Sequence, residues 1–129
     1  MNDFYCWEGI RNGATWVLDE TTKTAIQSDP KQIIGKVVTA TGNGEVGYGS
    51  SGKNPLGFVE MVEKELTNSE RLVVSVVFNQ ARENITCAGA AAGDFLACDG
   101  TGGLTKSSSA TSAKAYSVGD GKAIVYIHG

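Results

Sequence analysis

Apolar residues recur along the chain in the short, alternating or continuous runs that are typical of β-strands. The run at residues 72–78 is nearly all apolar and β-branched, which is the composition of a central strand. Similar but weaker patterns predict further strands at residues 14–18, 33–40, 56–62, 84–87, 94–98, 104–105, 113–118 and 123–128. No segment carries a helical apolar period over ten or more residues. The pattern therefore predicts an all-β protein.

A ten-residue segment of this pattern occurs twice, as GKVVTATGNG at residues 35–44 and as GDFLACDGTG at residues 93–102. Without a gap, three glycines and three apolar positions coincide: Gly35 with Gly93, Gly42 with Gly100, Gly44 with Gly102, Val37 and Val38 with Phe95 and Leu96, and Val46 with Leu104. Downstream of each copy, a basic residue leads into an apolar strand. The repeat predicts two related strand–turn–strand units, at about residues 35–78 and 93–129, in a small barrel or sandwich.

The repeated apolar positions are the expected core of this fold, because strands with one solvated face bury alternate side chains. The residues expected to be largely buried are Val37, Val38, Phe58, Leu72, Val74, Val76, Phe95, Leu96, Ile124 and Ile127. The segment at residues 19–30 is polar and turn-like, and residues 45–54 are rich in glycine and serine. Both segments are expected to be connections without regular structure.

Residues 1–32 differ from the rest of the chain, since Phe4, Tyr5, Trp7 and Trp16 crowd into the first sixteen positions. We divide the chain into an N-terminal arm and first strand, residues 1–32, and a β domain, residues 33–129. Tryptophan and tyrosine are the usual anchors of protein interfaces. These four aromatic residues are therefore the candidate partner interface.

The net charge, the apolar runs and the cysteine count limit the classes of partner and the compartment that we expect. A net charge of −3 with scattered basic residues gives no electrostatic reason to expect nucleic acid, and no apolar run approaches the roughly 18 residues that span a bilayer. Acidic residues at the N-terminus argue against a signal peptide, so synthesis in the cytoplasm is expected. Cys6, Cys87 and Cys98 are then expected to be small buried hydrophobes, although a Cys87–Cys98 bridge is open if the two lie on paired strands.

Motifs that resemble catalytic or nucleotide sites lack their structural context. Residues 42–47 match G-x-G-x-x-G and residues 47–53 resemble a phosphate loop, but the glycine- and serine-rich residues that follow cannot form the helix that both sites need. His128 is the only histidine and lies one residue from the end, so it cannot complete a triad or a zinc site. We therefore expect no catalytic, cofactor or metal site, and no enzyme.

Short motifs of the β region resemble a known family of structural proteins. They are Ala92-Gly93-Asp94, Asp99-Gly100, the strands that contain residues 56–59 and Ala115-Tyr116, a Gly119-Asp120-Gly121 turn, and a final apolar strand that ends in Gly129. Over about residues 35–129 the chain resembles the small capsid cement or decoration proteins of tailed bacteriophages. The resemblance implies a virion protein on the capsid exterior that binds the major capsid protein, reinforces the head, and forms a trimer.

Two other functions remain open from the residues. One is a phage tail or fibre β module. The other is a carbohydrate-binding module, which needs a row of exposed aromatic residues for which Tyr48, Tyr116 and Tyr126 are the candidates in the β region. Affinity for polysaccharides would distinguish the carbohydrate-binding module from the cement protein.

Overall fold

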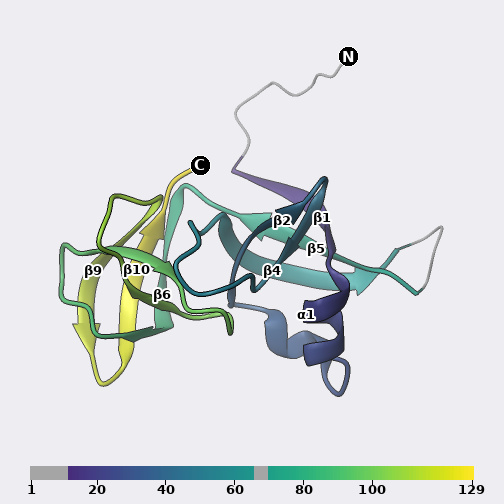
Figure 1. Cartoon of the computed structure of the whole chain (residues 1–129), viewed down its shortest axis with the longest axis horizontal. Coiled ribbons are helices and arrows are strands. Elements are labelled where there is room, and N and C mark those ends of the chain that lie inside the picture. Colours follow the sequence, from purple (N-terminus) through teal and green to yellow (C-terminus); the bar gives the residue numbers. More distant parts are fainter. Residues whose placement is uncertain (1–11, 66–69) are drawn as a thin grey trace, which may run out of the picture.

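The chain folds into two five-stranded β-barrels that lie side by side (Figure 1). The structure is a computed structural model, and it describes residues 12–65 and 70–129. Strands dominate both barrels, so the predicted all-β class with small barrels is confirmed.

The first barrel closes in the strand order β1-β3-β2-β4-β5. Its strands are β1 (Gly13–Leu18), β2 (Val37–Gly42), β3 (Glu45–Gly47), β4 (Gly57–Lys64) and β5 (Leu72–Val77). A short helix, α1 (Glu20–Ala25), and a 3-10 turn, η2 (Pro30–Ile33), connect β1 to β2. The expectation of irregular connections is thus wrong in two places, because residues 20–25 are helical and residues 45–47 form β3.

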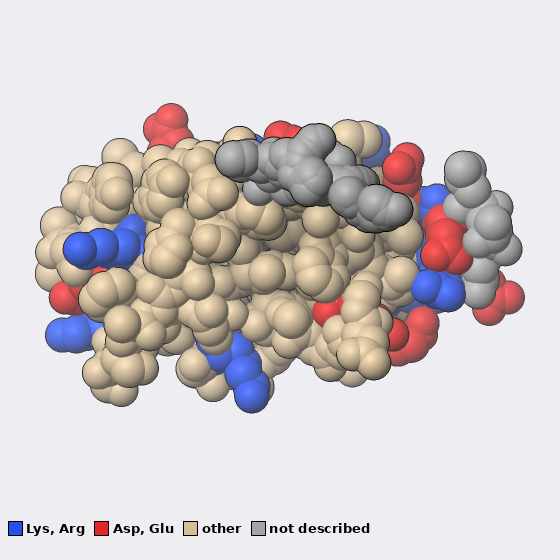
Figure 2. All heavy atoms as spheres, turned by 90° about the horizontal axis from the view of Figure 1, so that it is seen from above, with Lys and Arg blue, Asp and Glu red and all other residues tan. Residues whose placement is uncertain are grey.

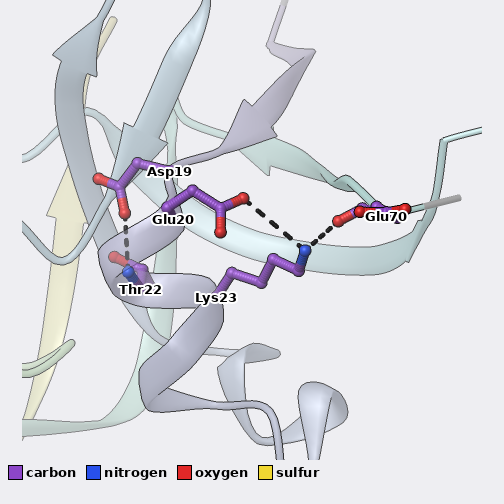
Figure 3. Close-up of polar contacts among 5 residues, drawn as sticks. All are labelled: Asp19, Glu20, Thr22, Lys23 and Glu70. Carbon is purple, nitrogen blue, oxygen red and sulfur yellow. Dashed lines mark hydrogen bonds and ion pairs between the residues drawn. The ribbon is translucent and has the colours of Figure 1, made fainter. Parts of the chain in front are cut away.

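Polar contacts at both ends of α1 explain why so polar a segment is helical (Figure 3). Asp19 caps the helix, since its Oδ1 accepts a hydrogen bond from the backbone N of Thr22 at 2.8 Å. Lys23 Nζ lies 3.7 Å from Glu20 Oε2 and also donates to the backbone carbonyl of Glu70, just before β5. These contacts hold α1 against the first barrel.

The second barrel closes in the order β10-β6-β8-β7-β9. Its strands are β6 (Gln80–Ala88), β7 (Phe95–Cys98), β8 (Leu104–Lys106), β9 (Ala113–Gly119) and β10 (Lys122–Ile127). Here β6 is longer than the predicted strand at residues 84–87, because it also pairs with the far end of β10.

The two barrels have the same strand pairing. In each, the first strand runs parallel to the third and antiparallel to the fifth, and the fourth strand pairs with the second and the fifth. The repeat therefore extends over residues 13–77 and 80–127, beyond the units at 35–78 and 93–129. It includes β1, which we grouped with the N-terminal arm but which closes the first barrel between β3 and β5.

The gapless alignment of the two repeats also holds at the level of register. Ala40 pairs with Val46 in the first barrel, and the aligned Cys98 pairs with Leu104 in the second. When the fourth strands are matched through their pairing with the second strands, Phe58 with Lys114, both carry a bulge at the same place: the register shifts between Val59 and Met61 in β4, and between residues 115 and 117 in β9. A β-bulge is a specific local feature, so its recurrence supports a true internal repeat.

Two clusters of buried side chains fill the barrels. The first contains Leu18, Ile26, Ile33, Val38, Val46, Val59, Leu72, Val74 and Val76. The second contains the inward-facing residues of the second barrel, such as Leu96 and Ile127, but also Val37 and Phe58 from β2 and β4. Both barrels consequently contribute to the second cluster, which we call the shared core.

Hydrogen bonds between the barrels surround this shared core. The backbone N of Val37 donates to the carbonyl of Gly102 at 2.8 Å. The loop after β3 pairs with the end of β7, because Cys98 N donates to the Lys53 carbonyl at 2.8 Å. The Asn54 carboxamide oxygen accepts from the backbone N of Ser112 at 2.8 Å. The barrels are thus joined by packing and by backbone pairing.

Candidate functional site

Of the four candidate interface residues, the structure describes only Trp16, because Phe4, Tyr5 and Trp7 lie outside the described residues. Trp16 lies on β1 opposite Val74, is half-buried, and packs against the first core cluster. It is therefore part of the wall of the first barrel. Its indole N is buried and has no hydrogen-bond partner among the residues that the structure describes.

Trp16 lines an open, largely apolar groove of about 800 Å³ on the first barrel, which we call the Trp16 groove. Its other apolar walls come from Leu56, from the end of β5 and from Phe78, which follows β5, and Gly129 also lines it. The chain enters β1 at the same place, since the carbonyl of Asn12 accepts a hydrogen bond from Phe78 N at 2.8 Å. The groove therefore lies beside the start of β1.

A second apolar surface lies on the outside of the second barrel, which we call the tyrosine patch: Phe95, Lys114, Tyr116, Ile124 and Tyr126. The rings of Tyr116 and Tyr126 stack with centroids 6.2 Å apart and planes inclined by 7°. Lys114 Nζ lies 5.4 Å from the centroid of the Phe95 ring. Tyr116, Ile124 and Phe95 are 59%, 41% and 37% exposed. Exposed aromatic residues of this kind are typical of a binding surface.

The exposure of Phe95 and Ile124 corrects the prediction that both are buried; the other eight predicted core residues are buried. The alternation within each strand gives the reason. Leu96 and Val125 point inward and are 0% exposed, so their neighbours point outward. The same alternation, with alanines inward and larger residues outward at 113–116, was the signal in the sequence that could have identified the patch.

Charged residues are few on one face of the molecule. Figure 2 shows that uncharged residues cover most of the face seen from above, while charges of both signs gather at its edges and are densest at the end where β4 and β5 extend. Ion pairs at that end include Arg71 with Glu65, at 3.3 Å. An uncharged face favours contact with a protein surface over contact with a polyanion.

The nucleotide-like motifs occupy a hairpin and a loop. Residues 42–47 contain the turn between β2 and β3, and residues 48–56 run without a helix into β4. The loop packs on the second barrel, where Gly52 N donates to the carbonyl of Cys98 at 2.8 Å. Its role in the structure is to join the barrels.

Tyr48, one of the three tyrosines considered for glycan binding, lies apart from the other two. It is half-buried against the first core cluster, and burial raises the pKa of its hydroxyl. A row of three exposed tyrosines therefore does not form, and only Tyr116 and Tyr126 come together.

Cys87 and Cys98 are buried free thiols in the second core cluster. Both pair with Leu104 from opposite sides, so β8 separates them by two strand spacings, about 10 Å, whereas a disulfide needs Cα atoms within about 7 Å. Burial, together with the charge of Asp99, raises the pKa of Cys98 to about 12. Both thiols are packing residues in this structure, and Cys6 lies outside the described residues.

The chain matches no protein-family model, and a search of curated proteins finds no match. Within residues 12–65 and 70–129, no group of three or more His, Cys, Asp or Glu residues is placed to hold a metal ion. No helix of this described part is long and apolar enough to cross a membrane. The described residues carry two apolar surfaces, the Trp16 groove and the tyrosine patch.

Proposed function

We propose that this chain is a structural virion protein that binds the outer surface of an assembled tailed-phage head, contacts the major capsid protein, forms a trimer there, and stabilises the shell. The proposal rests on the resemblance of residues 35–129 to capsid decoration proteins. It assigns no chemistry to the protein.

The observation that best supports this proposal is the core shared by the two barrels. Val37 and Phe58 are 0% exposed, although they lie on the first barrel and pack with the interior of the second. A hinge motion that separated the barrels would expose these two side chains to water, and the cost of exposing them opposes such a motion. A protein that braces a shell against internal pressure has to resist deformation between its points of attachment, and this scaffold meets that requirement.

The proposed contact with the shell is made by the aromatic segment that precedes β1. The carbonyl of Asn12 accepts a hydrogen bond from Phe78 N, directly after β5, so β1 begins beside the Trp16 groove. Burying one Trp or Tyr side chain in an interface removes about 150–250 Å² from water. Phe4, Tyr5 and Trp7 together supply enough apolar surface to make attachment depend on them.

The test is co-sedimentation of the purified chain with heads of the phage that encodes it, comparing the full chain with a variant that lacks residues 2–11. The variant retains Asn12, so we expect an unchanged far-ultraviolet circular dichroism spectrum and at least about a tenfold weaker attachment to heads. Ile34→Ser is the matched control, because Ile34 is exposed directly after η2 and lines neither the groove nor the patch.

Two results would contradict the proposal. Sedimentation of the full chain with purified tails and not with heads would favour the tail or fibre module. Equal attachment of the full and shortened chains to heads, with both folded, would exclude the arm as the adhesive segment. A gene adjacent to that of a major capsid protein would support the proposal independently.

A further inference from the structure

We infer that the tyrosine patch is a self-association surface, and that its occupant is the first barrel of a second copy of this chain. The inference follows from the internal repeat and stands whether or not the chain binds capsids. It goes beyond the arm-mediated contact proposed above, because it concerns a contact between two copies of the chain and not a contact with the shell.

One row of residues on the outside of the first barrel is covered by the second barrel. Val37 pairs with Phe58, and Phe58 pairs with Val77, so the three form a row across β2, β4 and β5. Their side chains face away from the first barrel's own core, and all three pack with the core of the second barrel. On the first barrel, this outward row is therefore an interface.

The second barrel has an equivalent row of residues on its outer face. Phe95 pairs with Lys114, and Lys114 pairs with Tyr126, across β7, β9 and β10. The gapless alignment places Phe95 on Val37, and the identical pairing then places Lys114 on Phe58 and Tyr126 on Val77. This row is the centre of the tyrosine patch, and nothing in the described chain covers it as the second barrel covers the first row.

A loop flanks the row in each barrel. In the first barrel the loop at residues 50–54 lies against the end of β7, where Cys98 is 1% exposed. The equivalent loop of the second barrel is the serine-rich segment 108–112, most of which is exposed. The position equivalent to Cys98 is Ala40, which is also exposed. The edge at Ala40 in a second copy could therefore pair with loop 108–112, as the edge at Cys98 pairs with loop 50–54 within one chain.

The surface that would receive the tyrosine patch, which we call the receiving end, lies on the first barrel of the second copy. The second barrel receives the first row at the end that contains Ser112, where Asn54 is bound. By the pairing of the fourth strands, Leu56 of the first barrel is equivalent to Ser112. Leu56 lines the Trp16 groove, which is open and apolar. At this end the second barrel is covered by the first barrel. The equivalent end of the first barrel is an open apolar groove.

The contact that results is head to tail: the patch of one copy meets the Trp16-groove end of the next. Contacts of this heterologous type form closed rings or open chains, depending on the rotation between copies. At the centre of this row the second barrel has Lys114 where the first barrel has Phe58. A lysine suits a surface that is exposed to water before two copies associate. An exposed Phe at this position would be a liability in a free monomer.

The experiment is sedimentation velocity of the full chain over a wide concentration range, with two variants. Phe95→Ser/Tyr116→Ser alters the patch, and Leu56→Asp alters the receiving end. Met61→Ser is the matched control, since Met61 is 53% exposed and lies on β4 outside both surfaces. We expect the full chain and the control to self-associate, and each of the two variants alone to associate at least about tenfold more weakly.

A mixture of the two variants separates this contact from its alternatives. One intact patch and one intact receiving end remain in the mixture, so a head-to-tail contact predicts a one-to-one complex that neither variant forms alone. If Leu56→Asp alone still dimerises, the patches bind each other and the inference is wrong. Leu56 is half-buried, so circular dichroism must first show that this variant is folded. If it is not, Thr15→Lys replaces it, because Thr15 lines the same groove and is exposed.

Two further outcomes would overturn the inference. One is a monomeric full chain at every concentration. The other is a patch variant that keeps its mass but loses retardation in polysaccharide-containing gels, because that result would assign Tyr116 and Tyr126 to glycan binding. Failure of head binding with self-association intact would affect only the proposed function.

Discussion

Phe58 connects the two barrels, and its truncation to alanine is the most informative test of the fold. The side chain is 0% exposed, it lies on β4 of the first barrel, and it packs in the core cluster of the second. Truncating a fully buried Phe costs about 3–5 kcal/mol, because the side chain loses its burial and leaves a cavity between rigid walls. For a chain of this size that loss lowers the melting temperature by roughly 10–20 °C.

The location of the damage is as important as its size. Phe58→Ala removes packing from Leu96, Ile127 and other inward-facing residues of the second barrel, while the first barrel's own cluster stays filled. We therefore expect faster native-state amide exchange in β7, β9 and β10 than in β1 and β3. Guanidinium unfolding followed by circular dichroism gives the free-energy change, and exchange measured by NMR gives its location.

Met61→Ala is the control for this experiment, because Met61 lies three residues further along the same strand and is 53% exposed. Its cost is expected to be within about 0.5 kcal/mol. A loss below about 1 kcal/mol for Phe58→Ala, or faster exchange confined to the first barrel, would refute the shared core.

Three further predictions concern single side chains. Asp99 Oδ1 accepts hydrogen bonds from the N and Oγ1 of Thr101 and from the N of Gly103, at 2.7, 2.9 and 3.1 Å, so Asp99→Ala should lower the free energy of unfolding by about 1–3 kcal/mol. Urea titration checks this against exposed Glu83→Ala, and an equal effect of both substitutions would contradict it. Gly47→Ala places a methyl group against Asp19 and Thr22 and should loosen α1 at a cost of about 1–3 kcal/mol, so an unchanged melting temperature would show that this contact relaxes freely. The pKa of Cys98, raised to about 12 by burial and by Asp99, means that the folded chain keeps a proton that the unfolded thiol, with a pKa of about 8.5, loses. Its contribution to stability is therefore complete below pH 8.5 or so and is lost as the pH rises toward 12, and Cys98→Ala should reduce this alkaline loss in urea unfolding.

The strands could be predicted from the sequence wherever alternation or a long apolar run marks them. The repeat could be predicted because glycines and apolar positions recur without a gap, and the register of Val46 and Leu104 follows that alignment. The three-residue strand β3 was missed because it lies within a glycine-rich segment and is too short to show a period. Helix α1 was missed for a similar reason, since its capping by Asp19 leaves only a weak mark in a polar stretch.

The candidate surfaces were harder to predict because they depend on tertiary contact. Val37 and Phe95 occupy the same position in the two repeats, yet one is buried and the other exposed, because only the first has a barrel packed over it. Trp16 resembles its aromatic neighbours in the arm, but pairing of β1 with β5 places it in the barrel wall. No local pattern in the sequence carries either contact.

The central functional claim is that the chain reinforces an assembled phage head, and DNA retention by heated heads tests it most directly. Heads produced without this chain are heated with and without added protein, and released DNA is followed by the fluorescence of a dye that cannot enter the shell. The proposal predicts that the full chain raises the temperature of DNA release in proportion to its occupancy on the shell, and that the variant without residues 2–11 does not. An identical release temperature at saturating bound protein would contradict the claim.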